Sequence, residues 1–320
     1  MDAVVIERFG DASVLQWKQH PEPQPSADQI AIKVSVTSLN FADTIWRNGT
    51  RPAKLPLVLG LDCAGTVMSV GANVRDFKPG DRVAAFVDGG SYAEIALARP
   101  VLSYKIPDGV SDEDACGLVM LVTAWNLVHL AGALKAGQSV LIHAAAGGVG
   151  SVAVQLAKKA GAKPVIGTVG DMTKAGVAKE CGADLVLPAS DFAAGVKEAT
   201  GGKGVDVILD SVAGATFAGS LEVLAAFGRY VNYGNAGGGP GVVKTSELHA
   251  NNRSVIGYSS GHYRASRPQD LRPAVEGCFR AIAAGELKIP VSKTFAMKDA
   301  AEAHRFIESR KSFGKILLKP

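Results

Sequence analysis

The strongest constraint on what this chain can fold into is an apolar run that leads through a turn of small residues into an amphipathic segment. Residues 140–143 (VLIH) are followed by residues 144–150 (AAAGGVG) and then by SVAVQLAKKAGA. This order predicts a buried strand, a tight turn and a helix. Glycines in such a turn let a pyrophosphate approach closely, and the free N–H groups and dipole of the helix start face that anion. The segment therefore predicts a dinucleotide-binding loop.

The chain beyond residue 137 repeats this alternation of strand and helix. A tight strand-to-helix turn would also favour glycine, so the loop alone is weak evidence and the units that follow it strengthen the prediction. The expected strands are 140–143, 164–168, 184–187, 205–209 and 229–233, with helices at 148–161, up to 182, up to 200 and at 216–226. Such alternation is typical of a doubly wound parallel sheet, an α/β fold that binds dinucleotides.

The first hundred residues follow a different pattern. Short runs typical of strands, at 30–36, 64–70, 82–87 and 92–97, are separated by turn signals such as KPGD at 78–81. A strand within 287–295, a helix at 297–310 and a strand at 316–318 are assigned to the same β-rich domain. A chain of 320 residues is long enough for two cores. We therefore expect one domain from 1–121 completed by 262–320, and a second from 122–261.

The residues after the second expected strand bear on the choice of nucleotide. In sites that prefer NAD, an acidic side chain at the end of this strand binds the ribose hydroxyls. Here the strand ends at Thr168, and VGDMTK follows at 169–174. Lys174 would neutralise a 2′-phosphate, whereas Asp171 would repel it unless it turned away as the N-cap of the next helix. The sequence therefore favours NADPH, with NADH as the alternative.

Charge and cysteine usage exclude several other classes of protein. The net charge of +4 is not gathered into a Lys/Arg stripe, so no nucleic-acid partner is expected. Arg264, Arg267 and Arg272 form the one dense basic patch, either a solvated loop that leads into a helix or a phosphate site. No apolar run is long enough for a signal-peptide core or a membrane span, which favours a cytoplasmic protein without a membrane partner. The four cysteines are too far apart for a zinc cluster or a disulfide framework.

A series of short motifs runs in order along nearly the whole chain. They are LNFAD at 39–43, LGLDCAG at 59–65, KPGDRV at 78–83, GSYAE at 90–94, the loop AAAGGVG, YGN at 233–235 and GKI at 314–316. On these motifs the chain resembles the zinc-independent quinone oxidoreductase (zeta-crystallin-like) family of the medium-chain dehydrogenase/reductases. The resemblance implies a GroES-like β-rich catalytic domain plus a Rossmann domain, with NADPH in the cleft between them. It also implies hydride transfer to quinones or other conjugated carbonyls, and a homodimer.

The resemblance also implies roles for particular residues. The implied cofactor-binding set is Asn40, Thr123, Ala146, Gly147, Gly148, Val149, Gly170, Lys174, Tyr233, Gly234, Asn235 and Lys315. Within it, 146–149 would hold the pyrophosphate, Gly170 and Lys174 would face the adenosine phosphate, and Lys315 would close the cleft. Thr123 would contact the nicotinamide ribose, and 233–235 would line the nicotinamide.

Three residues are the catalytic candidates. Asn40 and Asp43 would border the nicotinamide and the substrate, and Asp43 and Tyr92 are the candidate proton donors if a dedicated donor exists. Structural alternatives stand beside these roles: a loop cap for Asn40, a backbone-bonded helix hydroxyl for Thr123, and core packing for Tyr92 and Tyr233.

Two positions depart from the family's pattern near the adenosine phosphate. Ala189 stands where several relatives carry Tyr or His, and Asp171 stands where Ser or Thr is common. Both departures bear on the choice between NADPH and NADH, and neither affects the expectation of a dinucleotide.

The zinc-dependent members of the superfamily differ from this chain at their ligand positions. They carry Cys where this chain has Asn40, and a His-Glu pair where it has Leu61-Asp62. Only residues 84–90 separate Val83 from the next expected strand, which leaves no room for a cysteine-rich lobe. We therefore expect a metal-free protein. Without a Lewis acid, conjugated acceptors are the better substrates, because their product anions are delocalised and ordinary hydrogen bonds support them.

Two further functions stay open from the sequence. An enoyl-thioester reductase of the same fold would need a basic entrance for its acyl carrier, and only the arginine patch favours it. A non-catalytic, nucleotide-binding structural protein would bind the nucleotide without turnover.

Overall fold

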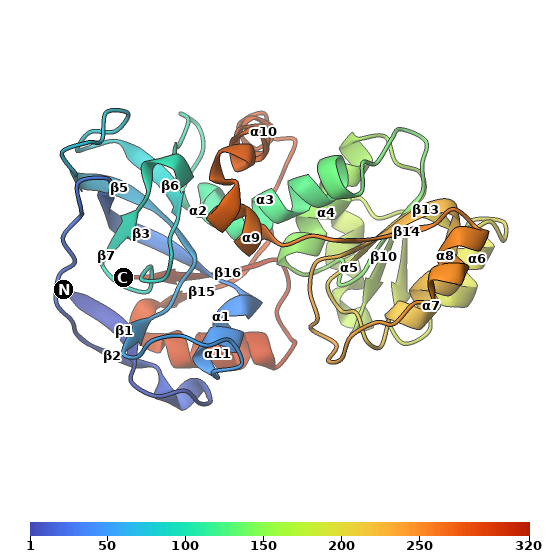
Figure 1. The fold of residues 1–320 in the computed structure, drawn as a ribbon, viewed down its shortest axis with the longest axis horizontal. Helices are drawn as coiled ribbons and strands as arrows, with labels where there is room; N and C mark the ends of the chain where they lie inside the picture. Colours follow the sequence, from blue (N-terminus) through green and yellow to red (C-terminus); the bar gives the residue numbers. More distant parts are fainter. The chain divides into compact units, whose positions relative to one another are not determined.

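The computed structural model describes residues 1–320, which is the full sequence printed above. The chain divides into two compact units (Figure 1). The first unit consists of Met1–Leu121 and His262–Pro320, and the second of Val122–Gly261. Neither unit contains a helix with the length and apolarity required to cross a bilayer.

The first unit is built on a seven-stranded sheet in which β15, β16, β3, β5, β6 and β8 follow one another and β7 pairs with β3. These strands are β3 (Ile30–Leu39), β5 (Asp62–Val70), β6 (Arg82–Phe86), β7 (Ile95–Ala98), β8 (Ser103–Lys105), β15 (Val291–Ala296) and β16 (Lys315–Lys319). Because β16 runs antiparallel to β3, the end of the chain completes the sheet formed by the first hundred residues. A smaller sheet has the order β2-β1-β4, from β1 (Asp2–Ile6), β2 (Gln16–Gln19) and β4 (Leu57–Val58).

Short helices connect the strands of the first unit. They are α1 (Phe41–Arg47), α2 (Asp112–Ala115), α10 (Arg272–Ala283) and α11 (Ala300–Glu308), with 3-10 turns η1 (Ala12–Val14), η2 (Pro100–Leu102), η5 (Pro268–Leu271) and η6 (Met297–Asp299). Two helices, α3 (Leu118–Asn126) and α9 (Ser260–Ser266), contain the points where the chain passes from one unit to the other. In α11 the buried residues are Ala300, Ala303 and His304, so one face of this helix points into the core.

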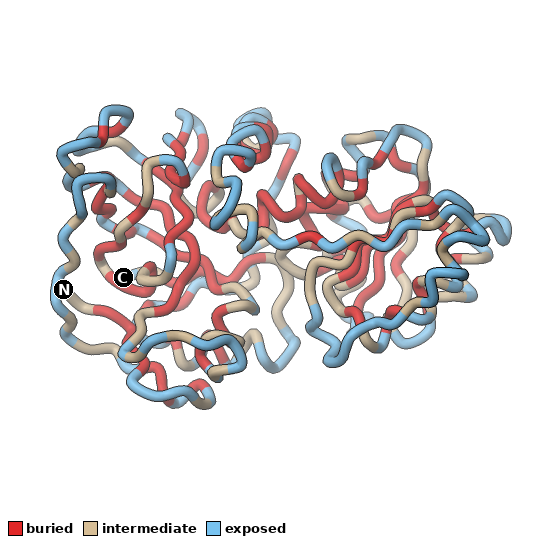
Figure 2. The backbone as a smooth tube through the Cα atoms, in the orientation of Figure 1, coloured by how far each residue is buried: buried red, intermediate tan, exposed pale blue.

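The second unit is a six-stranded sheet of parallel strands in the order β11-β10-β9-β12-β13-β14. The strands are β9 (Val140–Ile142), β10 (Val165–Val169), β11 (Leu185–Pro188), β12 (Val205–Asp210), β13 (Leu224–Asn232) and β14 (Ser254–Gly257). The order reverses at β9, as in a doubly wound dinucleotide-binding sheet, so the predicted fold class is confirmed. Its central strands are almost completely buried (Figure 2), which explains their continuous apolar sequences.

The helices of the second unit follow the strands in alternation. They are η3 (Leu127–Ala131, a π-helical turn that continues α3), α4 (Gly148–Lys159), the 3-10 turn η4 (Met172–Lys174), α5 (Ala175–Glu180), α6 (Ala193–Ala199), α7 (Phe217–Glu222) and α8 (Thr245–Ala250). The helix expected at 216–226 ends four residues early because β13 already begins at Leu224. In the same way, the strand expected at 92–97 begins only at Ile95, so Tyr92 lies in the segment that precedes β7.

Candidate functional site

The turn between β9 and α4 has the features of an anion-binding loop. Ala144 adopts a left-handed backbone with φ of 52°, and the N–H of Gly147 donates to the carbonyl oxygen of Ala144 at 2.9 Å. Gly147 is the N-cap of the 12-residue helix α4, and no side chain caps the helix. The first N–H groups of a helix have no partner within it, so those of Gly148 to Gly150 are left for an anion.

Small residues are required here because other backbone atoms lie very close. A Cβ atom at Gly150 would stand 2.2 Å from the carbonyl oxygen of Ala144, and one at Gly167 would stand 2.6 Å from the Cβ of Ala145. Gly147, Gly148 and Val149, in contrast, are only partly buried. The loop therefore packs tightly on its inner side and presents backbone amides on its outer side, which fits a dinucleotide pyrophosphate.

Buried polar side chains hold the strand ends beneath this loop. His143 is fully buried, with its two ring nitrogens each 2.9 Å from a hydroxyl, Nδ1 from that of Thr168 and Nε2 from that of Ser220. Burial lowers the pKa of His143, so the ring is neutral. This role of His143 was not predicted from the sequence, although a histidine directly after an apolar strand could have indicated it.

A buried carboxylate organises the next strand end in the same way. Asp210, at the end of β12, accepts hydrogen bonds from the N–H groups of Val212 and Ala213 at 2.6 and 3.1 Å. It also accepts from the hydroxyls of Thr216 and Tyr230 at 2.7 and 2.8 Å. A carboxylate with four donors is well satisfied, so Asp210 fixes the turn after β12 and needs no ligand.

The residues expected near an adenosine phosphate gather after β10. Asp171 is the N-cap of η4 and accepts a hydrogen bond from the N–H of Thr173 at 2.9 Å. The hydrogen bonds from the backbone and side chain of Thr173 lower the pKa of Asp171. The carboxylate is thus directed at its own helix start, as required if it is not to repel a phosphate. Lys174 ends η4 and is partly buried, which lowers its pKa. A Cβ atom at Gly170 would meet no atom within 4 Å, so there is open space beside this glycine.

The predicted nicotinamide-side residues follow β13. The N–H of Tyr233 donates to the carbonyl oxygen of Asp210 at 2.9 Å, Tyr233 and Gly234 are half-buried, and Asn235 is exposed. Because the strands are parallel, residues 146–149, 170–174 and 233–235 all lie at the carboxyl edge of this sheet. Thr123 lies outside this group, on α3, where it is buried.

In the first unit, Asn40 and Asp43 stand at the start of α1. Asn40 is the N-cap, and its N–H donates to Oδ2 of Asp43 at 2.8 Å. Asp43 is 1% exposed, and its Oδ1 has no hydrogen-bond partner. Burial raises the pKa of Asp43 to about 7, and nearby Asp62 raises it further, against the opposing effect of the Asn40 and Gly60 amides and the Tyr92 hydroxyl. Asp43 can therefore carry a proton near neutral pH.

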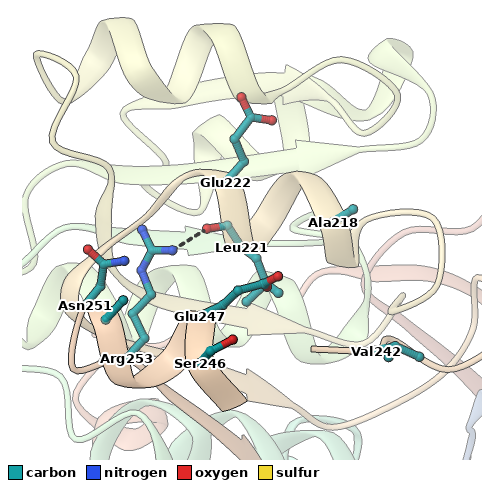
Figure 3. Close-up of a pocket in the computed structure, with 9 residues that line it drawn as sticks. Ala218, Leu221, Glu222, Val242, Ser246, Glu247, Asn251 and Arg253 are labelled. Atoms are coloured by element: carbon teal, nitrogen blue, oxygen red, sulfur yellow. Dashed lines mark hydrogen bonds between the residues drawn. The ribbon is translucent and has the colours of Figure 1, made fainter. Parts of the chain in front are cut away.

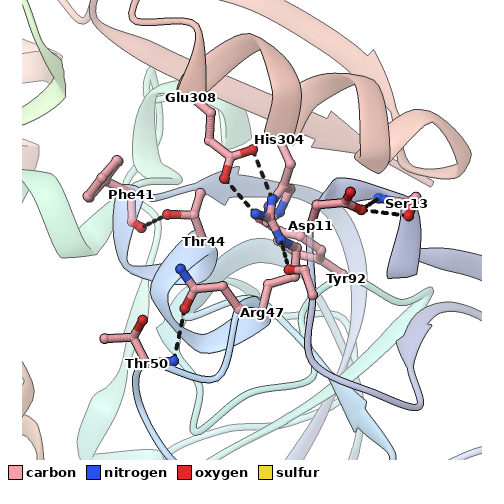
Figure 4. A network of polar contacts seen from close by, with 11 residues as sticks. Asp11, Ser13, Phe41, Thr44, Arg47, Thr50, Tyr92, His304 and Glu308 are labelled. Atoms are coloured by element: carbon pink, nitrogen blue, oxygen red, sulfur yellow. Dashed lines mark hydrogen bonds and ion pairs between the residues drawn. The ribbon is translucent and has the colours of Figure 1, made fainter.

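Tyr92 connects Asp43 to α11. Its hydroxyl is 3.3 Å from Oδ2 of Asp43 and 3.4 Å from Nε2 of His304. Nδ1 of His304 is 3.1 Å from Nη1 of Arg47, which also forms an ion pair with Glu308 (Figure 4). Tyr92 is fully buried and its pKa is raised well above its usual value by burial, so it keeps its proton.

Asp62 and Lys315 form a second buried polar group in this unit. Asp62 accepts from the hydroxyl of Ser38 and from the N–H of Val119, the latter at 2.8 Å. The ammonium of Lys315 donates to the carbonyl oxygens of Glu113 and Cys116 at 2.6 and 2.5 Å. Lys315 is 2% exposed and burial lowers its pKa. Its observed contacts thus tie β16 to the segment before α3, a structural role that the sequence did not indicate.

The structure does not gather the arginine patch into one site. The guanidinium of Arg264 lies over the ring of Phe86 at 5.4 Å, and that of Arg272 over the ring of Tyr104 at 5.3 Å. Arg272 also approaches Glu276 at 3.8 Å, whereas Arg267 is exposed. The two stacked arginines use different aromatic partners. Arg267 and Arg272 are exposed where the chain leads into α10, as in the solvated-loop alternative, whereas Arg264 is only partly exposed.

A separate pocket opens in the second unit between α7 and α8 (Figure 3). Arg253 forms part of its wall and donates to the carbonyl oxygen of Leu221 at 3.1 Å. The other lining residues are Ala218, Glu222, Val242, Ser246, Glu247, Ala250 and Asn251. None of the predicted site residues belongs to this set.

The metal-ligand positions of the zinc-dependent relatives are filled here by other side chains. Asn40 caps α1, and Asp62 is held by Ser38 and Val119. No three His, Cys, Asp or Glu side chains come together as a group that could hold a metal ion.

The doubly wound sheet, its uncapped glycine loop and the mostly antiparallel β-rich unit together define a medium-chain dehydrogenase/reductase. Two family models match the chain: the alcohol dehydrogenase GroES-like domain over residues 26–108, and the zinc-binding dehydrogenase over residues 148–277.

Individual relatives are similar over the full length. A quinone oxidoreductase of Pseudomonas aeruginosa is 33% identical and covers 98% of this chain and 97% of its own. A 2-haloacrylate reductase of a Burkholderia species is 34% identical, with 99% and 98% covered. The crystal structure of the Escherichia coli quinone oxidoreductase complexed with NADPH aligns with a TM-score of 0.93 at 34% identity and covers both chains completely. The chain therefore belongs to the quinone oxidoreductase family, as its motifs predicted.

Proposed function

We propose that this protein is an NADPH-dependent oxidoreductase that reduces quinones or related conjugated carbonyls without a metal. The observation that carries the proposal is the uncapped start of α4, where Gly150 packs against Ala144 and leaves three amides for a pyrophosphate. The NADPH complex of the Escherichia coli relative supports the choice of nucleotide.

Bound NADPH would supply the hydride. In this proposal the loop 146–149 holds the pyrophosphate with the free amides at the start of α4, Gly170 and Lys174 receive the adenosine phosphate, and 233–235 border the nicotinamide with Thr123. Asn40 orients the carbonyl of the acceptor, and Asp43 provides the proton that the reduced product needs. The fully bonded ammonium of Lys315 supports a positioning role for this residue rather than direct binding. The hydroxyl of Tyr92 acts through Asp43 because it is buried behind that carboxyl.

Metal independence is proposed from the identity of the residues at the ligand positions. Asn40 and Leu61 offer a neutral amide and no ligand where zinc enzymes carry Cys and His, and the remaining Asp62 is engaged by two donors. An acceptor that delocalises charge then suits the site better than a simple ketone.

A panel of acceptors tests the substrate class. Purified protein with NADPH is offered 9,10-phenanthrenequinone, 2-chloroacrylate and crotonyl-CoA in turn, and the loss of the reduced nicotinamide is followed by absorbance. 2-Chloroacrylate is included because one relative is named a 2-haloacrylate reductase. Turnover with quinone is expected. Turnover with crotonyl-CoA alone would replace the proposal by an enoyl-thioester reductase, and nucleotide binding without any turnover would indicate a structural role.

The preference for NADPH over NADH is tested at Lys174. Replacing it by alanine (Lys174→Ala) should raise KM for NADPH about tenfold, because one cation near the 2′-phosphate is worth roughly 1.4 kcal/mol, and should leave KM for NADH nearly unchanged. Lys179→Ala, at an exposed position of α5, is the matched control. If Lys174→Ala changes KM for NADPH and KM for NADH by the same factor, Lys174 does not bind the 2′-phosphate.

We further propose a cytoplasmic homodimer. The edge strand β14 has exposed residues at Ser254, Val255 and Gly257 and pairs only with β13, so its outer side is available to a second chain. The four cysteines are free, buried thiols, which suits a reducing compartment. Light scattering in solution should give twice the mass of the chain.

A further inference from the structure

A continuous chain of side-chain contacts in the first unit runs from Glu308, which is 37% exposed, to the buried Asp43. Nη1 of Arg47 lies 3.1 Å from Oε2 of Glu308 and 3.1 Å from Nδ1 of His304. The Tyr92 hydroxyl lies 3.4 Å from Nε2 of His304 and 3.3 Å from Oδ2 of Asp43. Figure 4 shows Arg47, His304 and Glu308 converging between α1 and α11. The members come from positions 43 to 308 of the sequence, so only the fold brings them together.

Arg47 fixes the direction of every hydrogen bond in this chain. A guanidinium can only donate, so Nδ1 of His304 must accept and carries no proton. Burial, assisted by the charge of Arg47, lowers the pKa of His304 to about 3, so the ring is neutral. Its single proton is therefore on Nε2, which donates to the Tyr92 oxygen. The Tyr92 hydroxyl is then free to donate only to Oδ2 of Asp43.

Oδ2 of Asp43 thus receives two donors, the Tyr92 hydroxyl and the N–H of Asn40. Oδ1 receives none. We infer that His304 is a positioning residue: held by Arg47 as the Nε2–H tautomer, it directs the Tyr92 hydroxyl onto Oδ2 and so confines the proton of the neutral Asp43 carboxyl to Oδ1. The inference rests on the proposed role of Asp43 as proton donor.

This arrangement orients a proton but does not conduct one. Arg47 never releases a proton near neutral pH, so nothing passes from Glu308 to His304. In the proposed reaction, the Oδ1–H bond of Asp43 breaks as a new O–H bond forms on the reduced quinone anion. Asp43 is left as a carboxylate that keeps the Tyr92 donor, and water returns the proton after the product leaves.

The charged groups around Asp43 determine the pH range in which its carboxyl carries a proton that it can donate. Burial and Asp62 favour its neutral form, whereas the Tyr92 and Asn40 donors and the Gly60 amide favour its ionised form. Arg264 and Arg47 are the nearby cations, and Arg47 is balanced by Glu308. Because the pKa of Asp43 is raised to about 7, the donor form predominates below that pH, and kcat should fall as pH rises through about 7.

Two substitutions at one position separate orientation from packing. In His304→Leu the Tyr92 hydroxyl is free to turn and accept a hydrogen bond from neutral Asp43, so the neutral form gains a partner. The midpoint of the kcat profile should then rise by about one pH unit. In His304→Gln the side-chain amide can still accept from Arg47 and donate to Tyr92, so the midpoint should stay near that of the wild type. A purely structural role would lower stability in both variants and leave the midpoint unchanged.

Two readouts do not depend on turnover. In ¹⁵N-histidine-labelled protein, the ring of His304 should show the Nε2–H tautomer without titration between about pH 5 and 8. The infrared carbonyl band of neutral Asp43, identified by its loss in Asp43→Asn, should titrate near the kinetic midpoint and shift upward in His304→Leu only. An Nδ1–H tautomer, or the same Asp43 titration in His304→Leu as in the wild type, would overturn the inference. If quinones are not reduced, the proposed function fails and these two measurements still decide the role of His304.

Discussion

Replacing Gly150 by alanine is expected to weaken NADPH binding by about a hundredfold, or roughly 2.7 kcal/mol. The new Cβ atom would stand 2.2 Å from the carbonyl oxygen of Ala144 and 2.8 Å from the Cα of Ala145. Both atoms belong to the backbone of the loop itself, so neither can rotate away. The start of α4 must move, and a shift of about 1 Å in a binding group is enough for an effect of this size. Calorimetric titration with NADPH measures it.

Gly176→Ala is the matched control for this substitution. Gly176 lies in α5, is exposed, and a Cβ atom there would meet nothing within 4 Å. The Gly176→Ala protein should bind NADPH with unchanged affinity. It should also gain about 0.4–1 kcal/mol of stability, because the entropy of the unfolded chain is lower. Unfolding by urea, followed for both variants, separates a damaged loop from a damaged domain. Wild-type affinity in a folded Gly150→Ala protein would contradict the role given to this loop.

Arg47→Met should lower the free energy of unfolding by about 3 kcal/mol. The side chain of Arg47 is 3% exposed and donates to the carbonyl oxygen of Gly10 at 3.1 Å, to His304 and to Glu308. Methionine fills much of the same volume but leaves the partly buried carbonyl oxygen of Gly10 and the buried Nδ1 of His304 without these donors. Urea unfolding followed by fluorescence measures the loss.

Arg305→Met serves as the control on the same stretch of chain. Arg305 is an exposed residue of α11, and such positions usually change stability by less than about 0.5 kcal/mol. If the Arg47 and Arg305 variants unfold at the same urea concentration, the buried network contributes nothing measurable to the fold.

The local features of the second unit could be predicted from the sequence because they depend on neighbouring residues. The run VLIH became β9 and the start of the glycine loop, and the helix after it was expected at 148–161 and observed as Gly148–Lys159. Asp171 as an N-cap was likewise readable, since a cap bonds to a residue two positions away. Apolar alternation, glycine turns and caps all act over a few residues.

The contacts that give the first unit its chemistry could not be predicted in this way. Arg47 and His304 are 257 positions apart, and Lys315 bonds to carbonyls about 200 positions away. The resemblance implied that Lys315 closes the cofactor cleft, and nothing in the sequence around Lys315 indicated that its ammonium donates to the carbonyl oxygens of Glu113 and Cys116. The same holds for Tyr92, which was expected within a strand and is observed before one, buried against Asp43. Burial and partner identity at these positions depend on the tertiary fold.

Turnover of metal-depleted protein tests the central claim most directly. The protein is dialysed against a chelator, its metal content is measured by elemental analysis, and oxidation of NADPH by 9,10-phenanthrenequinone is followed before and after. We predict full activity with far less than one metal ion per chain, because a delocalised product anion needs hydrogen bonds and no Lewis acid. Activity that disappears on dialysis and returns with zinc would contradict the account.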